Sequence, residues 1–222
     1  MAINSDDLAA GQVVTGFSFP VVALYKNTGG TVTYENGMDL ARGVSVDPDI
    51  ETANDDNVFY ANNRSAETAQ KRFRSGTVGL TVDGLLTQAE RLIMGIPAAS
   101  QTDITIGEGQ TAVTVGMTDY GDGQLIPYVG VGYVVRSMSN GIEMFRAVVY
   151  TKTRFDQFVI PAATEEDEID WQTTALSAQL MRDDTSAHNW QRVSEPVDSE
   201  LLAYNVVRSI LGMTTVDALP TT

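Results

Sequence analysis

The side chains that could perform acid–base catalysis at neutral pH are few in this sequence. His188 is the only histidine, and it stands in the turn-like run Ser186-Ala187-His188-Asn189. A histidine base needs a nucleophile held beside it, yet no Gly-x-Ser-x-Gly pattern occurs in the sequence, and neither does a phosphate-binding glycine loop. We therefore expect His188 to be a surface or structural residue, and we expect the protein not to be an enzyme.

A second kind of chemistry would use paired carboxylates, which bind hard cations and cleave glycosidic bonds. The run Asp47-Pro48-Asp49-Ile50-Glu51 begins like a calcium loop, but Thr52 stands where that loop needs glycine and Val58 where it needs a bidentate acid. The run from Asp119 to Gly123 has only two carboxylates and is typical of a turn. At both places we expect solvated loops or interfaces, with no metal or other cofactor.

The first acidic run opens a polar connection of about thirty residues, longer than a compact domain needs between two strands. It reads DPDIETANDDNVFYANNRSAETAQKRFRS, with acids first and cations last. Its few large apolar side chains cannot offset the entropy of ordering the segment. We therefore predict an interaction loop over residues 47–76 that orders against another chain. Its candidate interface residues are Asp47, Asp49, Glu51, Phe59, Tyr60, Arg64, Glu67, Lys71, Arg72, Phe73 and Arg74.

The cations at the end of this loop need an acidic partner. Like charges crowd together further along the chain, at Glu165, Glu166, Asp167, Glu168 and Asp170. Such crowding costs free energy unless water or a basic surface meets the charges. We hypothesise that the basic end of the loop, Lys71 to Arg74, docks on an acidic surface of a neighbouring copy of the chain.

Alternating apolar residues predict the strands that would hold these segments. Asn140-Gly141 suits a type I′ hairpin turn, whose two central residues need positive φ. Gly130 and Gly132 share one strand face, where they would admit another backbone or an aromatic ring. The pattern indicates a mainly β fold with antiparallel hairpins. We expect strands over residues 19–25, 31–34, 40–46, 77–82, 103–106, 111–117, 128–135, 142–153 and 171–181.

Two helices are expected beside these strands. Residues 87–94 begin with a capping box, Thr87 to Glu90, and Gly95 can take the left-handed conformation that ends a helix. Residues 198–211 carry an apolar stripe and precede a second such glycine. We divide the chain into a loose N-terminal arm over 1–16, a β domain over 17–212, and a tail over 213–222 that is flexible or bound to a neighbour.

Composition restricts the partners. The 222 residues carry a formal charge of −15, and the sequence pI is about 4.2. A surface of that sign repels phosphate, which disfavours groove-binding contact with nucleic acid without excluding nucleic acid that passes nearby. The absence of cysteine excludes disulfides and thiol nucleophiles. No run of eighteen apolar residues and no basic-then-apolar N-terminus occurs, so we expect neither a membrane span nor a secretory signal.

The order of these features resembles the major tail protein family of long-tailed bacteriophages, the tail tube subunits of the phi13-like type. The similarity runs from about Tyr34 to Trp190. Its residues are Val58-Phe59-Tyr60-Ala61-Asn62-Asn63 with Glu67, Leu92-Ile93-Met94-Gly95, Pro127 to Tyr133, the Asn140-Gly141 hairpin, Tyr150, Phe155, and Ile169-Asp170-Trp171-Gln172-Thr173. Asn62-Asn63 departs from the family, where an acidic residue is frequent, and the C-terminal helix has no clear counterpart.

The resemblance implies an antiparallel β-sandwich or barrel-like tail tube domain with a flanking helix. It implies a structural virion protein of the tail, made and assembled in the host bacterial cytoplasm. Copies would close into hexameric rings that stack into a tube, with the long loop and terminal arms bridging neighbours. The implied partners are further copies, the tape measure and tail terminator proteins, and DNA that passes through the lumen without specific binding. No membrane partner is implied.

Two alternatives remain open at this point. Trp171, Trp190, several tyrosines and many carboxylates also suit a carbohydrate-binding or glycoside-cleaving β-sandwich protein, although aromatic residues in strands are more often core than sugar platforms. A tube of a contractile injection machine, or a capsid-decorating protein, would remain in the structural class.

Overall fold

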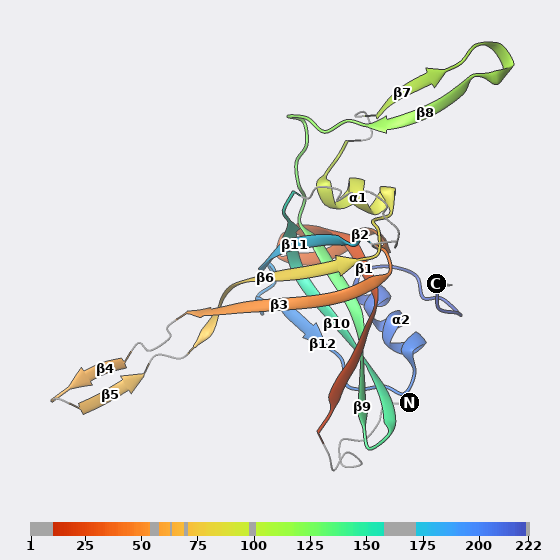
Figure 1. Ribbon diagram of the computed structural model, residues 1–222. Coiled ribbons are helices and arrows are strands. Elements are labelled where there is room, and N and C mark those ends of the chain that lie inside the picture. Colours follow the sequence, from red (N-terminus) through yellow and green to blue (C-terminus); the bar gives the residue numbers. More distant parts are fainter. Residues whose placement is uncertain are drawn as a thin grey trace.

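The computed structural model describes residues 11–53, 58–62, 64–68, 71–97, 101–157 and 172–220 (Figure 1). The chain is mainly β, as expected. Its strands are β1 (Val13–Thr28), β2 (Thr31–Asp39), β3 (Gly43–Ala53), β4 (Val58–Ala61), β5 (Arg64–Thr68), β6 (Arg72–Val82), β7 (Gln101–Ile106), β8 (Val113–Thr118), β9 (Val129–Ser139), β10 (Ile142–Phe155), β11 (Thr174–Met181) and β12 (Gln191–Val193). The helices are α1 (Thr87–Met94) and α2 (Glu200–Ile210), with a 3-10 turn over Gly109–Thr111.

One antiparallel sheet organises the described residues. Its strand order is β2-β1-β9-β10-β11-β6-β3, and β12 pairs with β10 beside β11. The sheet curls, because apolar side chains of β6 and β11 pack in the same core as side chains of β1 and β9. The ring of Phe17 on β1 lies against the backbone of Gly43, at the start of β3. This curled sheet agrees with the expected sandwich or barrel-like class.

The centre of the sheet is covered on both faces. On the inner face, α1 contributes Ala89, Ile93 and Met94 to the core of the curled sheet. On the outer face, α2 buries Ala203, Tyr204 and Val207 against β1, β9 and β10 (Figure 1). A strand segment that is buried on both faces must be apolar at successive positions, as β9 is from Val129 to Val135 and β10 from Ala147 to Tyr150.

Several local predictions are confirmed. Asn140 and Gly141 have φ of 50° and 79°, as a type I′ turn requires, and Gly95 ends α1 with φ of 63°. The predicted C-terminal helix is present, and the Ser199 side chain accepts a hydrogen bond from the Leu202 amide at its start. In the region over residues 171–181, the described residues form a strand from Thr174 onward, and Trp171 lies outside the described residues.

The predicted interaction loop over residues 47–76 is wrong as a loop, because strand pairing continues through much of it. β3 runs on to Ala53 and β6 begins at Arg72, and these two residues are themselves paired. A polar segment can pair in this way because the ladder satisfies its backbone groups while alternate side chains stay in solvent. The distal parts of β3 and β6, with the small β4–β5 hairpin beyond them, form the first arm of the molecule (Figure 1).

Three smaller expectations also differ from the structure. The last four residues of the predicted N-terminal arm, 13–16, belong to β1 and lie along β9, while residues 1–10 fall outside the described residues. The Thr87 hydroxyl does not cap α1, whose N-cap is Leu86, because Thr87 is itself the first helical residue. The tail packs on its own chain: Asn205 and Val216 exchange two hydrogen bonds of 2.9 Å.

The two glycines of β9 perform the role expected of them. A Cβ on Gly130 would lie 2.5 Å from Cε1 of the Tyr34 ring and 2.7 Å from Cδ2 of Leu211, and one on Gly132 would lie 2.5 Å from Cγ1 of Val207. The missing side chains therefore let Tyr34 and α2 approach the sheet.

We predict that Gly130→Ala lowers the free energy of unfolding by about 1–3 kcal/mol, the usual cost of overpacking a well-filled core. The urea midpoint of unfolding measures this. Gly84→Ala is the matched control, because no atom lies within 4 Å of its added methyl group. Equal midpoints for the two variants would contradict the packing role of Gly130.

Candidate assembly surfaces

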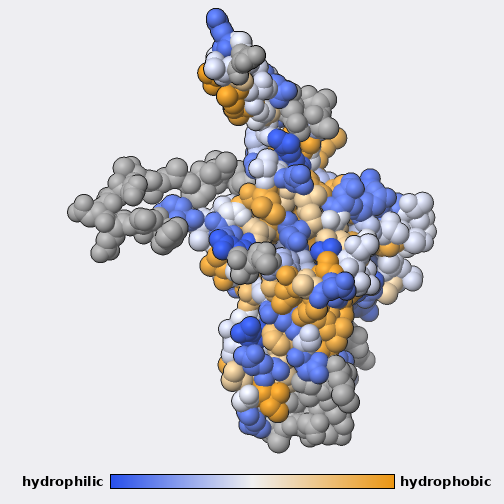
Figure 2. Space-filling view, turned by 90° about the vertical axis from the view of Figure 1, so that its right-hand side faces the viewer, coloured by the Kyte–Doolittle hydropathy of each residue, from blue (hydrophilic) through white to orange (hydrophobic). Residues whose placement is uncertain are grey.

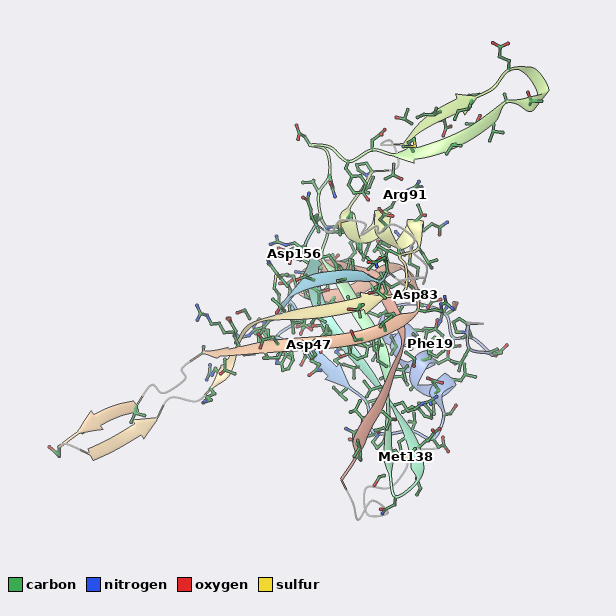
Figure 3. All side chains as sticks on the ribbon, in the orientation of Figure 1. Phe19, Asp47, Asp83, Arg91, Met138 and Asp156 are labelled. Carbon is green, nitrogen blue, oxygen red and sulfur yellow. The ribbon has the colours of Figure 1, made fainter. Side chains whose placement is uncertain are left out.

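The predicted interface acids form a row on one face of β3. Asp47, Asp49 and Glu51 are exposed, and they alternate with residues that face the other way, of which Val46 and Ile50 pack against the core. Asp49 lies opposite Thr77 of β6, which in turn lies opposite Gln179 of β11. This face of the sheet is therefore polar and bears three carboxylates along one strand. Figure 3 labels Asp47 on this strand.

The predicted interface cations gather where the first arm leaves the body. Lys71, Arg72 and Arg74 are exposed, and Arg182 is exposed beside them, donating a hydrogen bond to the Phe73 carbonyl. We call these four residues the cationic arm base. Arg182 was not predicted, because it is distant in sequence and follows a different strand.

Phe73 was predicted to be an interface residue, and its ring is partly covered by the body of the protein. Its ring stacks on Trp190 with centroids 4.9 Å apart and an interplanar angle of 8°, and the Arg182 guanidinium lies 5.8 Å from its centroid. Both aromatic residues are partly buried against the core. Phe73 therefore anchors the arm to the body, and only part of its ring is available to a partner.

The other predicted interface residues lie at the tip of the first arm. The backbones of Phe59, Tyr60, Arg64 and Glu67 belong to the β4–β5 hairpin, with Phe59 paired to Glu67. The side chains of these four residues are outside the described part of the chain, as is the acidic run from Glu165 to Asp170. The structure thus leaves Asp47 and Asp49 within the large sheet, gathers the cationic arm base where the first arm begins, and puts the remaining predicted interface residues in the tip hairpin.

Sequence reasoning missed a second arm, the hairpin of β7 and β8. Its register pairs Ile104 with Val115 and Ile106 with Val113, so these four side chains share one face. The opposite face is polar, with Thr105 and Thr114 hydroxyls 3.0 Å apart. The apolar side chains are 45% to 66% exposed. The alternating pattern predicted two strands, but such a pattern normally indicates burial and gave no sign that this face would lie in solvent.

The two ends of the large sheet offer another kind of surface. β2 and β3 are the terminal strands of the path, and neither has a second partner strand among the described residues. Pro48 lies within β3, a position that suits an edge strand because proline cannot donate to a ladder. Backbone groups along such edges are able to pair with a strand of another chain.

Several titratable side chains form hydrogen bonds and ion pairs that link parts of the fold. The Tyr25 hydroxyl donates to Asp184 at 2.8 Å, and Lys152 Nζ lies 2.8 Å from the same carboxylate oxygen. Burial raises the pKa of Tyr25 to about 12, with the hydrogen bond to the Asp184 carboxylate acting in the same direction and the bond from the Asp184 amide opposing it. The hydrogen bonds from Lys152 and then Tyr25 lower the pKa of Asp184. His188 Nδ1 lies 3.3 Å from the Asp183 carbonyl in the same loop.

An open groove of about 800 Å³ lies at the junction of β1, β3 and the end of β6. It is lined largely by apolar residues such as Phe17, Phe19 and Leu86, and Figure 3 labels Phe19 and Asp83 there. Both of its carboxylates are engaged, Asp83 with Arg42 and Asp39 with the Tyr204 hydroxyl.

The described residues contain no cluster of three or more His, Cys, Asp or Glu side chains that could hold a metal ion. They also contain no helix that is long and apolar enough to cross a membrane.

Comparison with known proteins gives no family for the chain. No family model matches the sequence, and no curated protein matches it.

We predict that Tyr25 contributes to an alkaline loss of stability. Since its pKa is raised above the ordinary value of about 10, the neutral hydroxyl stabilises the fold fully below pH 10, and this contribution is lost as pH rises through about 12. Urea midpoints between pH 9 and pH 12 should fall less steeply for Tyr25→Phe than for the wild type. Identical slopes would show that Tyr25 ionises as readily in the folded chain as in the unfolded one.

Proposed function

We propose that this chain is a structural subunit that assembles with copies of itself, and specifically a major tail tube subunit of a long-tailed bacteriophage. The observation that carries the proposal is a sheet open at both ends in a molecule with two protruding arms (Figure 1). A solitary protein gains nothing from exposed strand edges and an exposed apolar hairpin, which are aggregation hazards. A subunit that pairs them with neighbours does gain from them.

Ring closure would follow from joining unlike edges. If β2 of one copy lies beside β3 of the next, the contact is heterologous, and a heterologous contact forms a closed ring when the rotation between copies divides a full turn. The sheet would then continue from subunit to subunit and leave no open edge. The arms would remain for contacts within and between rings. The hexameric number comes from the family resemblance alone.

The polar face of β3, β6 and β11 is the surface we assign to the channel. It bears Asp47, Asp49 and Glu51, and the chain has a net charge of −15. A wall of this sign cannot retain DNA, because tight binding to the phosphates depends on cations that release condensed counterions. DNA would slide past such a wall without being held.

The carbohydrate alternative receives no specific support. Trp190 is stacked on Phe73 and partly buried, so its face is not a free platform for a sugar ring. Trp171 lies outside the described residues.

We predict that the purified protein forms rings or tubes in negative-stain microscopy as its concentration increases, because the described part of each copy has an edge without a partner strand at each end of its sheet. Analytical ultracentrifugation over the same range should show a transition from monomer to large species. A strict monomer at every concentration, or a monomer that binds glycans on an array, would contradict the proposal.

We predict that tubes carrying Asp47→Lys, Asp49→Lys and Glu51→Lys assemble but retain double-stranded DNA. Reversal would place cations along the channel, and retention should fall steeply with salt because it depends on counterion release. Co-sedimentation of DNA with tubes at 50 and 200 mM salt measures this. Glu195→Lys with Asp217→Lys provides a control at two exposed acids outside β3. Equal retention by the two sets of tubes would place the acids of β3 outside the channel.

A further inference from the structure

The second arm has an apolar face that no described residue of its own chain covers. Ile106 and Val113 near the tip are 66% and 61% exposed, and Met117 is 46% exposed further down. Figure 2 shows hydrophobic side chains along this projection, which stands away from the body. A two-stranded hairpin has marginal stability on its own and gains order when a surface covers its apolar face.

The second arm is also purely acidic. Residues 101–128, which comprise the hairpin and its return to the body, contain no lysine or arginine. Their carboxylates are Asp103, Glu108, Asp119 and Asp122. The missing partner should therefore present cations beside apolar surface.

The cationic arm base is a surface of that kind. Arg182 lies over the Phe73 ring of the partly buried Phe73–Trp190 stack. Lys71, Arg72 and Arg74 are the chain neighbours of Phe73, and Arg72 alternates to the other face of β6. The cations would attract the carboxylates of a second arm, while Arg182 and the exposed part of the Phe73 ring would meet its apolar side chains. Complementary charge of this kind selects the partner and fixes its register.

A single copy cannot make this contact. The first arm and the second arm leave the body in different directions, and their ends lie far apart (Figure 1). The acidic apolar hairpin can reach a cationic arm base only on another molecule.

We propose that the β7–β8 hairpin of one copy docks on the cationic arm base of a second copy. The inference rests on the proposed self-assembly and names the two surfaces that meet. Each copy carries one hairpin and one cationic arm base, so the contact is heterologous and passes from copy to copy. It also gives the basic end of the first arm an acidic partner different from the run between Glu165 and Asp170.

The test exchanges charge between the two surfaces. One variant carries Arg72→Glu and Arg74→Glu, a second carries Glu108→Lys and Asp119→Lys, and a third carries all four changes. Each of the first two should need at least about tenfold more protein to assemble, because like charges then face each other across the contact. The third should assemble again at nearly the wild-type concentration, and an equal mixture of the first two should co-assemble.

Two controls separate docking from other effects. Glu195→Lys with Asp217→Lys changes the net charge as much as the hairpin reversal does, at exposed acids outside both surfaces, and should leave the assembly concentration unchanged. Ile106→Thr with Val113→Thr keeps the charge and the β-branched shape but removes apolar contact, and should raise the assembly concentration. Unchanged urea midpoints would verify that every variant is folded.

The outcomes distinguish this proposal from the proposed function. If the wild type forms rings or tubes and the folded hairpin variant does so equally well, or if the fourfold variant fails to regain assembly, docking is overturned and the assembly function stands. If the wild type is monomeric at every concentration, both are overturned. Loss in each single-surface variant together with recovery in the fourfold variant would establish the contact.

Discussion

The fold depends on burying the β9–β10 hairpin on both of its faces. The inner face needs the curled strands β6 and β11 with α1, and the outer face needs α2. Gly130 and Gly132 make the outer contact close enough to exclude water, because any side chain there would strike Tyr34, Val207 or Leu211. The hairpin thus fixes the positions of both helices and of the inner strands, and the remaining elements are arranged around it.

The centre of the fold is closely packed and hydrogen-bonded, whereas its outer strands and arms expose backbone edges and apolar side chains. Among the described residues, the terminal strands of the sheet have no partner along their outer edges, and the second arm has an apolar face in solvent. The arms add little to the buried core, so their sequence is free to serve contacts with other molecules. This division between a saturated core and unsatisfied extremities is the physical basis of the assembly we propose.

Local sequence signals predicted the centre well. Asn140-Gly141, Gly95 and the stripe of α2 act within a few residues of themselves, so their conformations could be predicted without knowledge of the rest of the fold. The first arm could not be predicted in this way. Its pairing between Ala53 and Arg72 follows a one-residue bulge that shifts the register set further inward, between Val46 and Leu80. A polar strand also lacks the apolar alternation by which strands are recognised. Arg182 was missed because only the fold brings it beside Phe73.

Net charge limits how such copies could meet. Molecules with a charge of −15 repel one another at long range, yet at physiological ionic strength this repulsion is screened beyond about 8 Å. Charges in direct contact are screened much less. A cationic arm base and an acidic hairpin would therefore still attract each other, while the repulsion between the two bodies would be weak. The charge pattern would therefore permit this local contact despite the net charge of the bodies. High salt would weaken the ion pairs but leave the apolar faces paired, and a sheet closed edge to edge would depend on salt least of all, because its strength lies in backbone hydrogen bonds.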